Sequence, residues 1–284
     1  MPWTAGAIGT PAGLPGGIAH AEVDPAWQPW LDLLEISLEE PGDAWRAALR
    51  VRADRAAGAP LLDGALVNID GQRAGALVQR LAQAAGLVTD GCDAPAMIRA
   101  ALARDEETLL GMADDSDVPI DAFAVVAHAA AIPLLHTAAT LLDANAATAW
   151  QRSYCPVCGA RPSLAEARGI ERDRRLRCGA CSADWPLAML HCAFCDELDH
   201  KKLGSLSVDG EGQLRYIETC ESCRGYLKAV KTFDALTFRS LMLLDLSTIP
   251  LDLIAHERGY ARPARPGWAP HVELAAWPER GTMP

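Results

Sequence analysis

Paired cysteines are the residues of this chain whose type and spacing point most directly to chemistry. Eight of the nine cysteines lie within 69 residues as four Cys-x-x-Cys pairs: Cys155/Cys158, Cys178/Cys181, Cys192/Cys195 and Cys220/Cys223. A Cys-x-x-Cys turn directs two thiolates at one ion, so two such turns supply four sulfurs at tetrahedral geometry. Four pairs in succession, with Cys92 as the single other cysteine, therefore predict two closed metal sites whose ligands are these eight cysteines.

Disulfide bonds are the main alternative to metal binding. They suit small secreted domains, but the sequence lacks a secretory signature, since its first Lys or Arg is Arg46 and Pro11 and Pro15 interrupt its early residues. It also lacks the run of about 18 uninterrupted apolar residues that a transmembrane helix needs. We therefore expect a cytoplasmic protein without membrane contact, whose thiols stay reduced.

The spacing of the pairs favours sequential pairing. The first two pairs are separated by 19 residues and the last two by 24, and both intervals fit a β-hairpin or a small three-stranded sheet. Sequential pairing closes the shorter loops and predicts two self-contained modules. An interleaved pairing stays open as the alternative.

Composition describes an ordinary soluble protein with an acidic body. The 284 residues are 50% hydrophobic and 22% charged, enough for one large or two medium domains. The net charge is −11, and it is unevenly placed: residues 150–232 carry 13 basic and 11 acidic side chains, whereas the remainder carries 13 basic and 26 acidic ones. An acidic body does not attract nucleic acid or anionic membranes.

Apolar residues recur at helical spacing through the first half of the chain. After a flexible tail at 1–24, the pattern predicts a helical domain at 25–150 with helices from 30 to about 41, at 72–85, at 95–112 and at 122–144. Gly86 suits a C-cap of the second helix, Pro95 suits the first turn of the third, and Pro133 is a site for a kink in the last.

Short alternating stretches replace the helical pattern from Tyr154 onward. They predict a first four-cysteine module at 151–190 and a second at 191–233. An apolar stripe then predicts a C-terminal helix at 234–262, which Pro250 breaks or kinks, and 263–284 is expected to be a loosely ordered tail. The expected fold class is α+β.

Four segments around the pairs carry a family resemblance. They are Tyr154-Cys-Pro-Val-Cys-Gly-Ala-Arg-Pro162, Leu176-Arg-Cys-Gly-Ala-Cys181, Cys192-Ala-Phe-Cys195 and Glu218-Thr-Cys-Glu-Ser-Cys-Arg-Gly-Tyr-Leu-Lys228. In this order, and with Ala255-His-Glu-Arg-Gly-Tyr-Ala-Arg262 after them, they resemble the formate dehydrogenase accessory protein family FdhE. The resemblance covers about residues 120–265; the N-terminal third is similar only as a helical region rich in alanine and leucine.

The resemblance implies a helical N-terminal domain followed by two rubredoxin-like modules that hold iron. It also implies a non-catalytic role, because these accessory proteins are required for active respiratory formate dehydrogenase. They contact its catalytic subunit, which carries a molybdenum or tungsten pterin, before export by the twin-arginine route. Composition alone instead favours zinc, the usual ion of closed four-cysteine sites. The expected cofactors are thus two ions per chain, Fe or Zn.

The residues themselves also predict a protein that is not an enzyme. An ion held by four thiolates has no open position at which to activate water, and the glycines lack the phosphate-loop pattern. His128 and His136, eight apart on an apolar segment, are expected to be core or partner-facing residues rather than ligands. His191 and His200 flank the third pair, where a full cysteine set makes them unnecessary.

Two other functions stay open. A zinc-ribbon nucleic-acid-binding protein would use the basic run Arg172, Arg174, Arg175 and Arg177, although such a run usually solvates one face of a hairpin. A rubredoxin-like iron protein would act in electron transfer or redox sensing. For a protein partner, aromatic residues beside the turns are either exposed anchors or covers over their own metal sites. These are Trp185, Phe194 and Tyr226.

Overall fold

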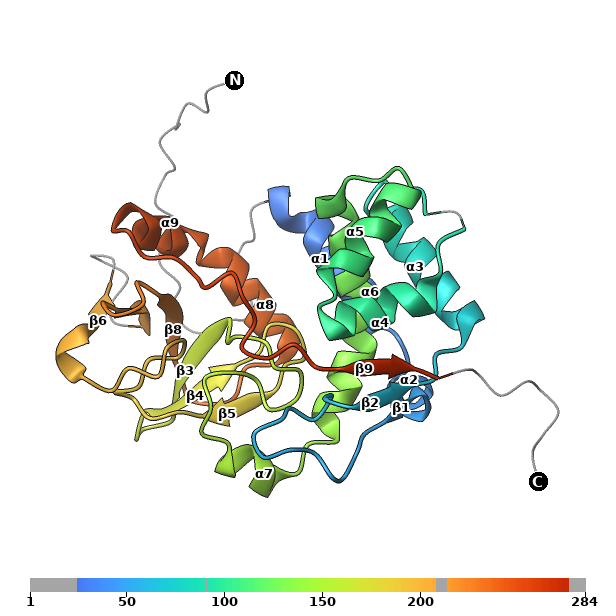
Figure 1. The fold of residues 1–284 in the computed structure, drawn as a ribbon. Helices are drawn as coiled ribbons and strands as arrows, with labels where there is room; N and C mark the ends of the chain where they lie inside the picture. The colour runs from blue at the N-terminus through green and yellow to red at the C-terminus, as the bar shows by residue number, and fades with distance from the viewer. Residues whose placement is uncertain (1–24, 90, 208–213, 276–284) are drawn as a thin grey trace.

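The helical half of the chain is built around one long helix, α6 (Ile120–Thr140). The computed structural model describes residues 25–89, 91–207 and 214–275, and within these α6 packs against five shorter helices (Figure 1). These are α1 (Gln28–Leu38), α2 (Gly42–Ala48), α3 (Gly71–Ala84), α4 (Ala94–Ala103) and α5 (Glu106–Asp115). Close packing is possible because Ala127, Ala130 and Ala131 are fully buried and small. The predicted tail at 1–24 lies outside the described residues.

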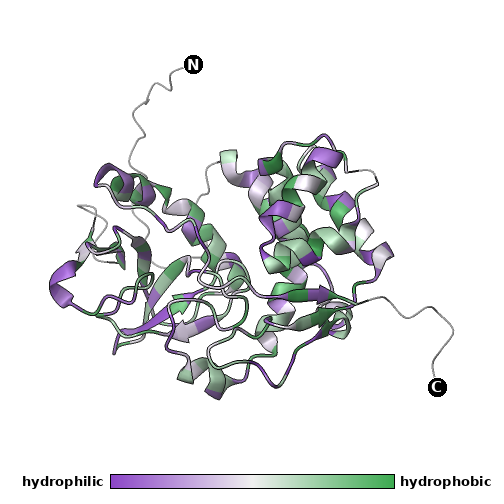
Figure 2. Ribbon diagram, in the orientation of Figure 1, coloured by the Kyte–Doolittle hydropathy of each residue, from purple (hydrophilic) through white to green (hydrophobic). Residues whose placement is uncertain are grey.

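Helix α6 is long and apolar enough, by length and composition, to cross a membrane. However, 61% of its most apolar window is buried inside the protein, as expected of a core helix. The helices around it carry polar residues beside apolar ones (Figure 2). Pro133 lies inside α6, which runs through it as one helix. Two short elements flank this half: η2 (Pro25–Trp27) precedes α1, and α7 (Ala144–Ala149) follows α6.

Aspartates set where several helices begin. The side chains of Asp70, Asp93 and Asp105 accept hydrogen bonds from backbone N–H groups three residues later, at 2.9, 3.1 and 3.1 Å, and so cap α3, α4 and α5. The single helix predicted at 95–112 is therefore wrong. Arg104, with a φ of 54°, ends α4, and Asp105 starts α5. Neither a glycine nor a proline stands at this break, and apolar residues keep their helical spacing across it. The pattern therefore predicts one helix where there are two.

The second half contains one six-stranded sheet with the order β5-β4-β3-β8-β7-β6. The strands are β3 (Leu164–Arg168), β4 (Asp173–Arg177), β5 (Asp184–Pro186), β6 (Leu203–Leu206), β7 (Arg215–Cys220) and β8 (Tyr226–Thr232), with the short turn η3 (His200–Lys202) before β6. Parallel pairing of β3 with β8 joins the two cysteine modules. The prediction of self-contained modules is thus wrong, because each module's exposed strand edge is covered by the other.

Two helices follow the sheet where one was predicted at 234–262. They are α8 (Phe238–Ser247) and α9 (Ile249–Glu257), which meet at Thr248. Pro250 stands in the first turn of α9, where a missing N–H costs nothing. Leu241 and Leu244 of α8 pack with β3, β8 and α1, whereas Leu251 and Ala255 of α9 pack on β7 and β8.

The chain returns to the helical half at its end. Strand β9 (Val272–Leu274) pairs in parallel with β2 (Ala65–Val67), which also pairs with β1 (Leu49–Arg50). Residues 272–274 thus form a strand inside the predicted loose tail, and two short strands interrupt the predicted helical domain. All three are too short for alternation to reveal them. One continuous apolar cluster contains α6, β2 and the first cysteine module, so the two halves share a core.

Candidate metal centres

The eight paired cysteines gather in space as two groups of four. Centre 1 consists of Cys155, Cys158, Cys178 and Cys181, and centre 2 consists of Cys192, Cys195, Cys220 and Cys223. Within each centre the sulfurs all lie within 4.8 Å of one another. The structure therefore has the sequential grouping that the spacing favours. Centre 1 joins a turn before β3 to the turn between β4 and β5, and centre 2 joins a turn after β5 to the turn between β7 and β8.

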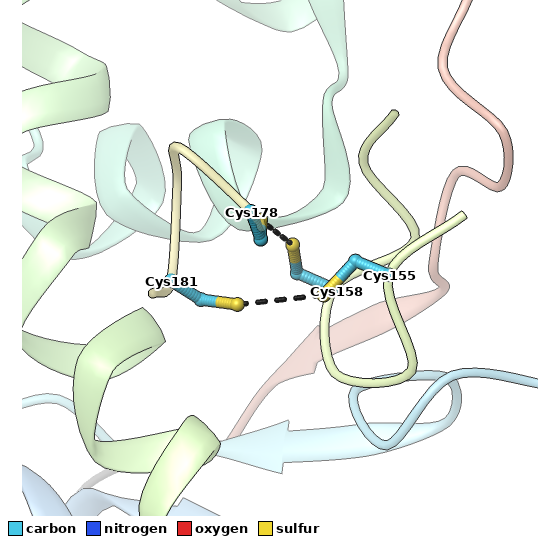
Figure 3. A group of neighbouring side chains, drawn as sticks. All are labelled: Cys155, Cys158, Cys178 and Cys181. Atoms are coloured by element: carbon cyan, nitrogen blue, oxygen red, sulfur yellow. Dashed lines mark hydrogen bonds between the residues drawn. The ribbon is translucent and has the colours of Figure 1, made fainter. Parts of the chain in front are cut away.

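Sulfur–sulfur distances test whether the groups fit a metal ion. Two contacts cross centre 1, from Cys155 to Cys181 and from Cys158 to Cys178, each 3.5 Å long (Figure 3). In centre 2 the corresponding distances are 3.8 and 3.7 Å. A tetrahedron of thiolates about 2.3 Å from an ion has edges of about 3.8 Å, whereas a disulfide bond is about 2.05 Å long. All nine cysteines are free, and both groups fit a four-thiolate ion.

The four turns share one backbone conformation. In each, the N–H of the first cysteine donates to the carbonyl five residues later, at 2.8–3.0 Å. The residue after each second cysteine is left-handed, with φ between 55° and 73°. These residues are Gly159, Ser182, Asp196 and Arg224. Only the first is a glycine, so the sequence signals this conformation at one turn of four.

Backbone N–H groups inside the turns face the sulfurs. Those of Val157, Ala180 and Phe194 each lie 3.4 Å from the sulfur of the first cysteine in their turn. A charge-assisted hydrogen bond to a thiolate offsets part of its charge. The turns therefore suit thiolates, which are the form that binds a metal.

Centre 1 is enclosed on every side. Its four cysteines are fully buried, and burial raises the pKa of the Cys155 and Cys181 thiols well above the ordinary value. Hydrogen bonds from the neighbouring thiols lower the pKa of Cys158 instead. A dication bound by the group would hold all four sulfurs as thiolates.

The helical half and the C-terminal segment both lock the first turn of centre 1. The N–H groups of Leu61 and Leu62 donate to the carbonyls of Pro156 and Val157, at 2.7 and 2.9 Å. On the other side, the N–H of Trp268 donates to the Gly159 carbonyl at 2.9 Å. The turn is thus fixed by backbone bonds to segments about 95 residues before it and about 110 residues after it along the chain, distances that no local pattern spans.

Centre 2 is open on one side. Cys192 and Cys220 are buried, whereas Cys195 and Cys223 are exposed. A cleft of about 310 Å³ lies against the buried pair. Two exposed apolar side chains, Met189 and Leu190, line this cleft.

Comparison with known proteins connects this geometry to a family. Residues 190–266 match the family model described as FdhE, C-terminal domain, which encloses all of centre 2. This stretch of the chain is similar to the C-terminal domain of FdhE proteins. The resemblance noted in the sequence is thereby confirmed.

Curated relatives carry the same name. Over 122 residues the chain is 34% identical to an FdhE homolog of Aquifex aeolicus, covering 41% of each. It is 33% identical over 118 residues to an FdhE homolog of Pseudomonas aeruginosa, covering 39% of this chain and 38% of the relative. It is 32% identical over 114 residues to FdhE of Escherichia coli, covering 39% of this chain and 36% of the relative. The matched stretch thus spans about two fifths of the length of each relative.

A solved structure shares the fold. The crystal structure of the FdhE protein from Pseudomonas aeruginosa matches with a TM-score of 0.50 and 21% identity, over 84% of this chain and 93% of that one. At this identity the match shows the fold alone. It supports the α+β class, a mixed helix and sheet fold with two four-cysteine groups.

The histidines singled out in the sequence do not join the two cysteine groups. Among the described residues, the groups that could hold an ion contain cysteine alone. His136 stacks on Phe238 with ring centroids 5.8 Å apart, and Nε2 of His191 lies 3.0 Å from Asp196. His128 faces an apolar groove between α1, α6 and α8, where burial lowers its pKa. His200 lies in η3.

The aromatic residues beside the turns are buried. Trp185 is fully buried, with Nε1 donating to the Arg152 carbonyl at 2.9 Å. Tyr226 is 2% exposed and donates from its hydroxyl to Asp252 at 2.7 Å. Phe194 is also buried. The expectation of exposed anchors is therefore wrong at these positions. Tyr226 packs against α9 of the C-terminal segment.

The basic run on β4 is used internally. Arg174 pairs with Glu218 at 2.6 Å, and the guanidinium of Arg177 pairs with buried Glu166. Arg175 pairs with Asp184 at 3.2 Å. A phosphate-binding face needs cations that are free to meet the backbone of a nucleic acid. Arg174 instead joins the two modules, whereas Arg175 and Arg177 form ion pairs within the first module. Arg172 is exposed in the turn before β4.

Proposed function

We propose that this protein is a non-enzymatic accessory factor required for active respiratory formate dehydrogenase. It binds the catalytic subunit of that enzyme in the cytoplasm, before export. The match of residues 190–266 to the FdhE C-terminal domain carries the proposal. Cysteines that bind metal as thiolates suit a compartment in which thiols stay reduced.

We further infer that each centre holds one ion through its four cysteines. The sulfur spacing and the N–H groups directed at the sulfurs support this inference. A four-thiolate ion supplies a covalent cross-link between two turns and, if it is iron, one-electron exchange. It offers no open position for substrate, which agrees with a role outside catalysis.

A gene deletion with complementation tests the proposed function. Loss of the gene is expected to abolish respiratory formate dehydrogenase activity, and the intact chain is expected to restore it. Variants that lack one cysteine pair should fail to restore it, whereas Cys92→Ser, which changes the half-buried cysteine outside both centres, should succeed. Recovery of the catalytic subunit with the tagged protein from formate-grown cells tests the contact. Full activity in the deletion strain, with no such subunit recovered, would contradict the proposal.

Electron transfer is the second candidate, because centre 2 presents Cys195 and Cys223 at the surface. Electron exchange with a partner requires such an exposed edge. Elemental analysis and absorption spectra separate the two readings. Iron with a ferric-thiolate band that bleaches reversibly on reduction would favour a redox role, whereas stoichiometric zinc would favour a scaffold.

A further inference from the structure

The two centres have the same ligands and the same turns, yet they differ in access. All four cysteines of centre 1 are fully buried. In centre 2 the second cysteine of each turn is exposed, and so are most of the residues next to it, at 196, 198–200, 221, 222 and 224. Two of the four cysteines are therefore exposed at one centre and none is exposed at the other.

The contacts that support the turns differ in the same direction. At centre 1 the segments at 61–62 and 268 bond to the backbone of the turn and cover it. At centre 2 the supporting contacts fix the turns without covering the sulfurs. Glu197 accepts from Lys202 at 3.1 Å and bridges to Ser222, and the N–H of Ala261 donates to the Arg224 carbonyl at 2.9 Å.

Cations are placed differently as well. The Arg104 guanidinium lies against centre 1, with Nη2 3.3 Å from the Cys158 sulfur. Beside centre 2, Arg224 turns away to Glu221 and to the ring of Tyr260, whose centroid is 4.0 Å from Cζ. A positive charge against a thiolate holds it in place as a ligand. At centre 2, Lys202 interacts electrostatically with buried Cys220, whereas Cys195 and Cys223 are exposed residues.

We propose that centre 2 is an exchangeable metal centre, at which an external thiol displaces Cys195 or Cys223, and that centre 1 is a permanent structural one. In the exchange the incoming thiol loses its proton and its sulfur bonds to the ion. The bond from the ion to the cysteine breaks, and the released thiolate takes up a proton. No electron is transferred. The partner chemistry is thus a thiolate, either of a small molecule or of a protein surface.

This inference rests on the proposed occupancy of both centres, so the experiment begins by counting ions. Full-length protein with Cys92→Ser, loaded with zinc, should contain two ions per chain. Fewer than two would contradict the occupancy rather than the exchange. The protein is then mixed with a chromogenic chelator, 4-(2-pyridylazo)resorcinol, with and without glutathione. One ion is expected to leave at least about tenfold faster than the other, and glutathione should accelerate that phase alone.

Brief alkylation with iodoacetamide, followed by peptide mapping, identifies the centre that releases its ion first. This measurement leaves all eight metal ligands as the native cysteines. Cys195 and Cys223 should be modified first, while the centre 1 cysteines stay protected. Matched variants provide a second measurement: Cys195→Ser should remove or speed the fast phase, and Arg104→Met should leave the fast phase unchanged. Equal release rates for the two ions, or early labelling of centre 1, would overturn the proposal. The peptide map needs no change to a metal ligand, so it decides the question even if Cys195→Ser does not fold.

Discussion

Arg104 and Cys158 lie 54 positions apart in the chain, yet Nη2 of Arg104 donates a hydrogen bond to Sγ of Cys158 at 3.3 Å. Nη1 of the same guanidinium donates to the Cys158 carbonyl. Burial lowers the pKa of Arg104, but attraction to the surrounding thiols outweighs burial and the net pKa is raised. The side chain therefore stays charged, and it ties the end of α4 to centre 1.

Replacing this arginine should weaken centre 1 selectively. Arg104→Met keeps the apolar stem but removes the charge and both donors, so centre 1 is expected to bind its ion about tenfold more weakly. Arg104→Lys keeps the charge and loses the planar fork, so an intermediate affinity is expected. Competition with a chelator measures both affinities, with centre 2 of the same molecule as the internal control. Wild-type affinity at centre 1 in Arg104→Met would show that the contact is incidental.

Gly159 should tolerate no side chain. Its φ is +73°, and an added Cβ would overlap the Trp268 carbonyl oxygen and lie 2.8 Å from the Trp268 Cβ. Gly159→Ala is expected to lower the free energy of unfolding by about 3 kcal/mol, since backbone strain adds to the clash. Gly169 is a matched control, because its φ is +65° but no atom lies within 4 Å of the added Cβ. For Gly169→Ala, denaturant titration should show that the free energy of unfolding falls by about 1 kcal/mol. Equal losses of stability in the two variants would mean that the segment around Trp268 moves away from the added Cβ without a measurable cost.

The centres could be predicted from sequence because their determinants are local. A Cys-x-x-Cys turn places two sulfurs by itself, and short spacings favour joining neighbouring turns. The left-handed residues after Cys181, Cys195 and Cys223 could not be predicted, since Ser182, Asp196 and Arg224 carry no glycine signal. The metal turn imposes that conformation on whichever residue stands there.

The long-range parts of the fold left no such signal. Register between β3 and β8 places Leu164 opposite Lys228, and nothing in either strand names its partner. Strand β9 is three residues long and joins a sheet about 200 residues before it. The break at Arg104 does have a local signal in retrospect. Asp105 followed by Glu106 and Glu107 is a typical helix start.

Removing each metal centre should have unequal effects on the helical half. Cysteines of both centres lie in the apolar cluster that this half shares with the sheet, but the first turn of centre 1 also accepts backbone hydrogen bonds from Leu61 and Leu62 of this half. The double variant Cys155→Ser, Cys158→Ser should therefore lose one bound ion. Its helical signal in circular dichroism should also melt with much lower cooperativity. Cys192→Ser with Cys195→Ser should cost one ion as well, with the helical signal retained. Identical melting curves for the two variants would argue against a shared unit of folding.

Lys228 should be a strong anchor of the C-terminal helices. It is 1% exposed, and its Nζ lies 2.7 Å from Asp245 and 2.8 Å from Asp252, on α8 and α9. Arg262 approaches the same two carboxylates, at 3.1 and 3.3 Å. Lys228→Met leaves two acidic groups with one cation, so the free energy of unfolding is expected to fall by about 3 kcal/mol.

Two further variants test whether charge imbalance causes that loss. Adding Asp252→Asn to Lys228→Met removes one carboxylate charge, so part of the lost stability should return. Lys201→Met, at an exposed position in η3, should change stability by no more than about 0.5 kcal/mol. Denaturant titration of the four proteins measures these differences, and elemental analysis should find the metal content unchanged. If the double variant is less stable than Lys228→Met, the hydrogen bond from Tyr226 to Asp252, rather than charge balance, decides the stability of this corner.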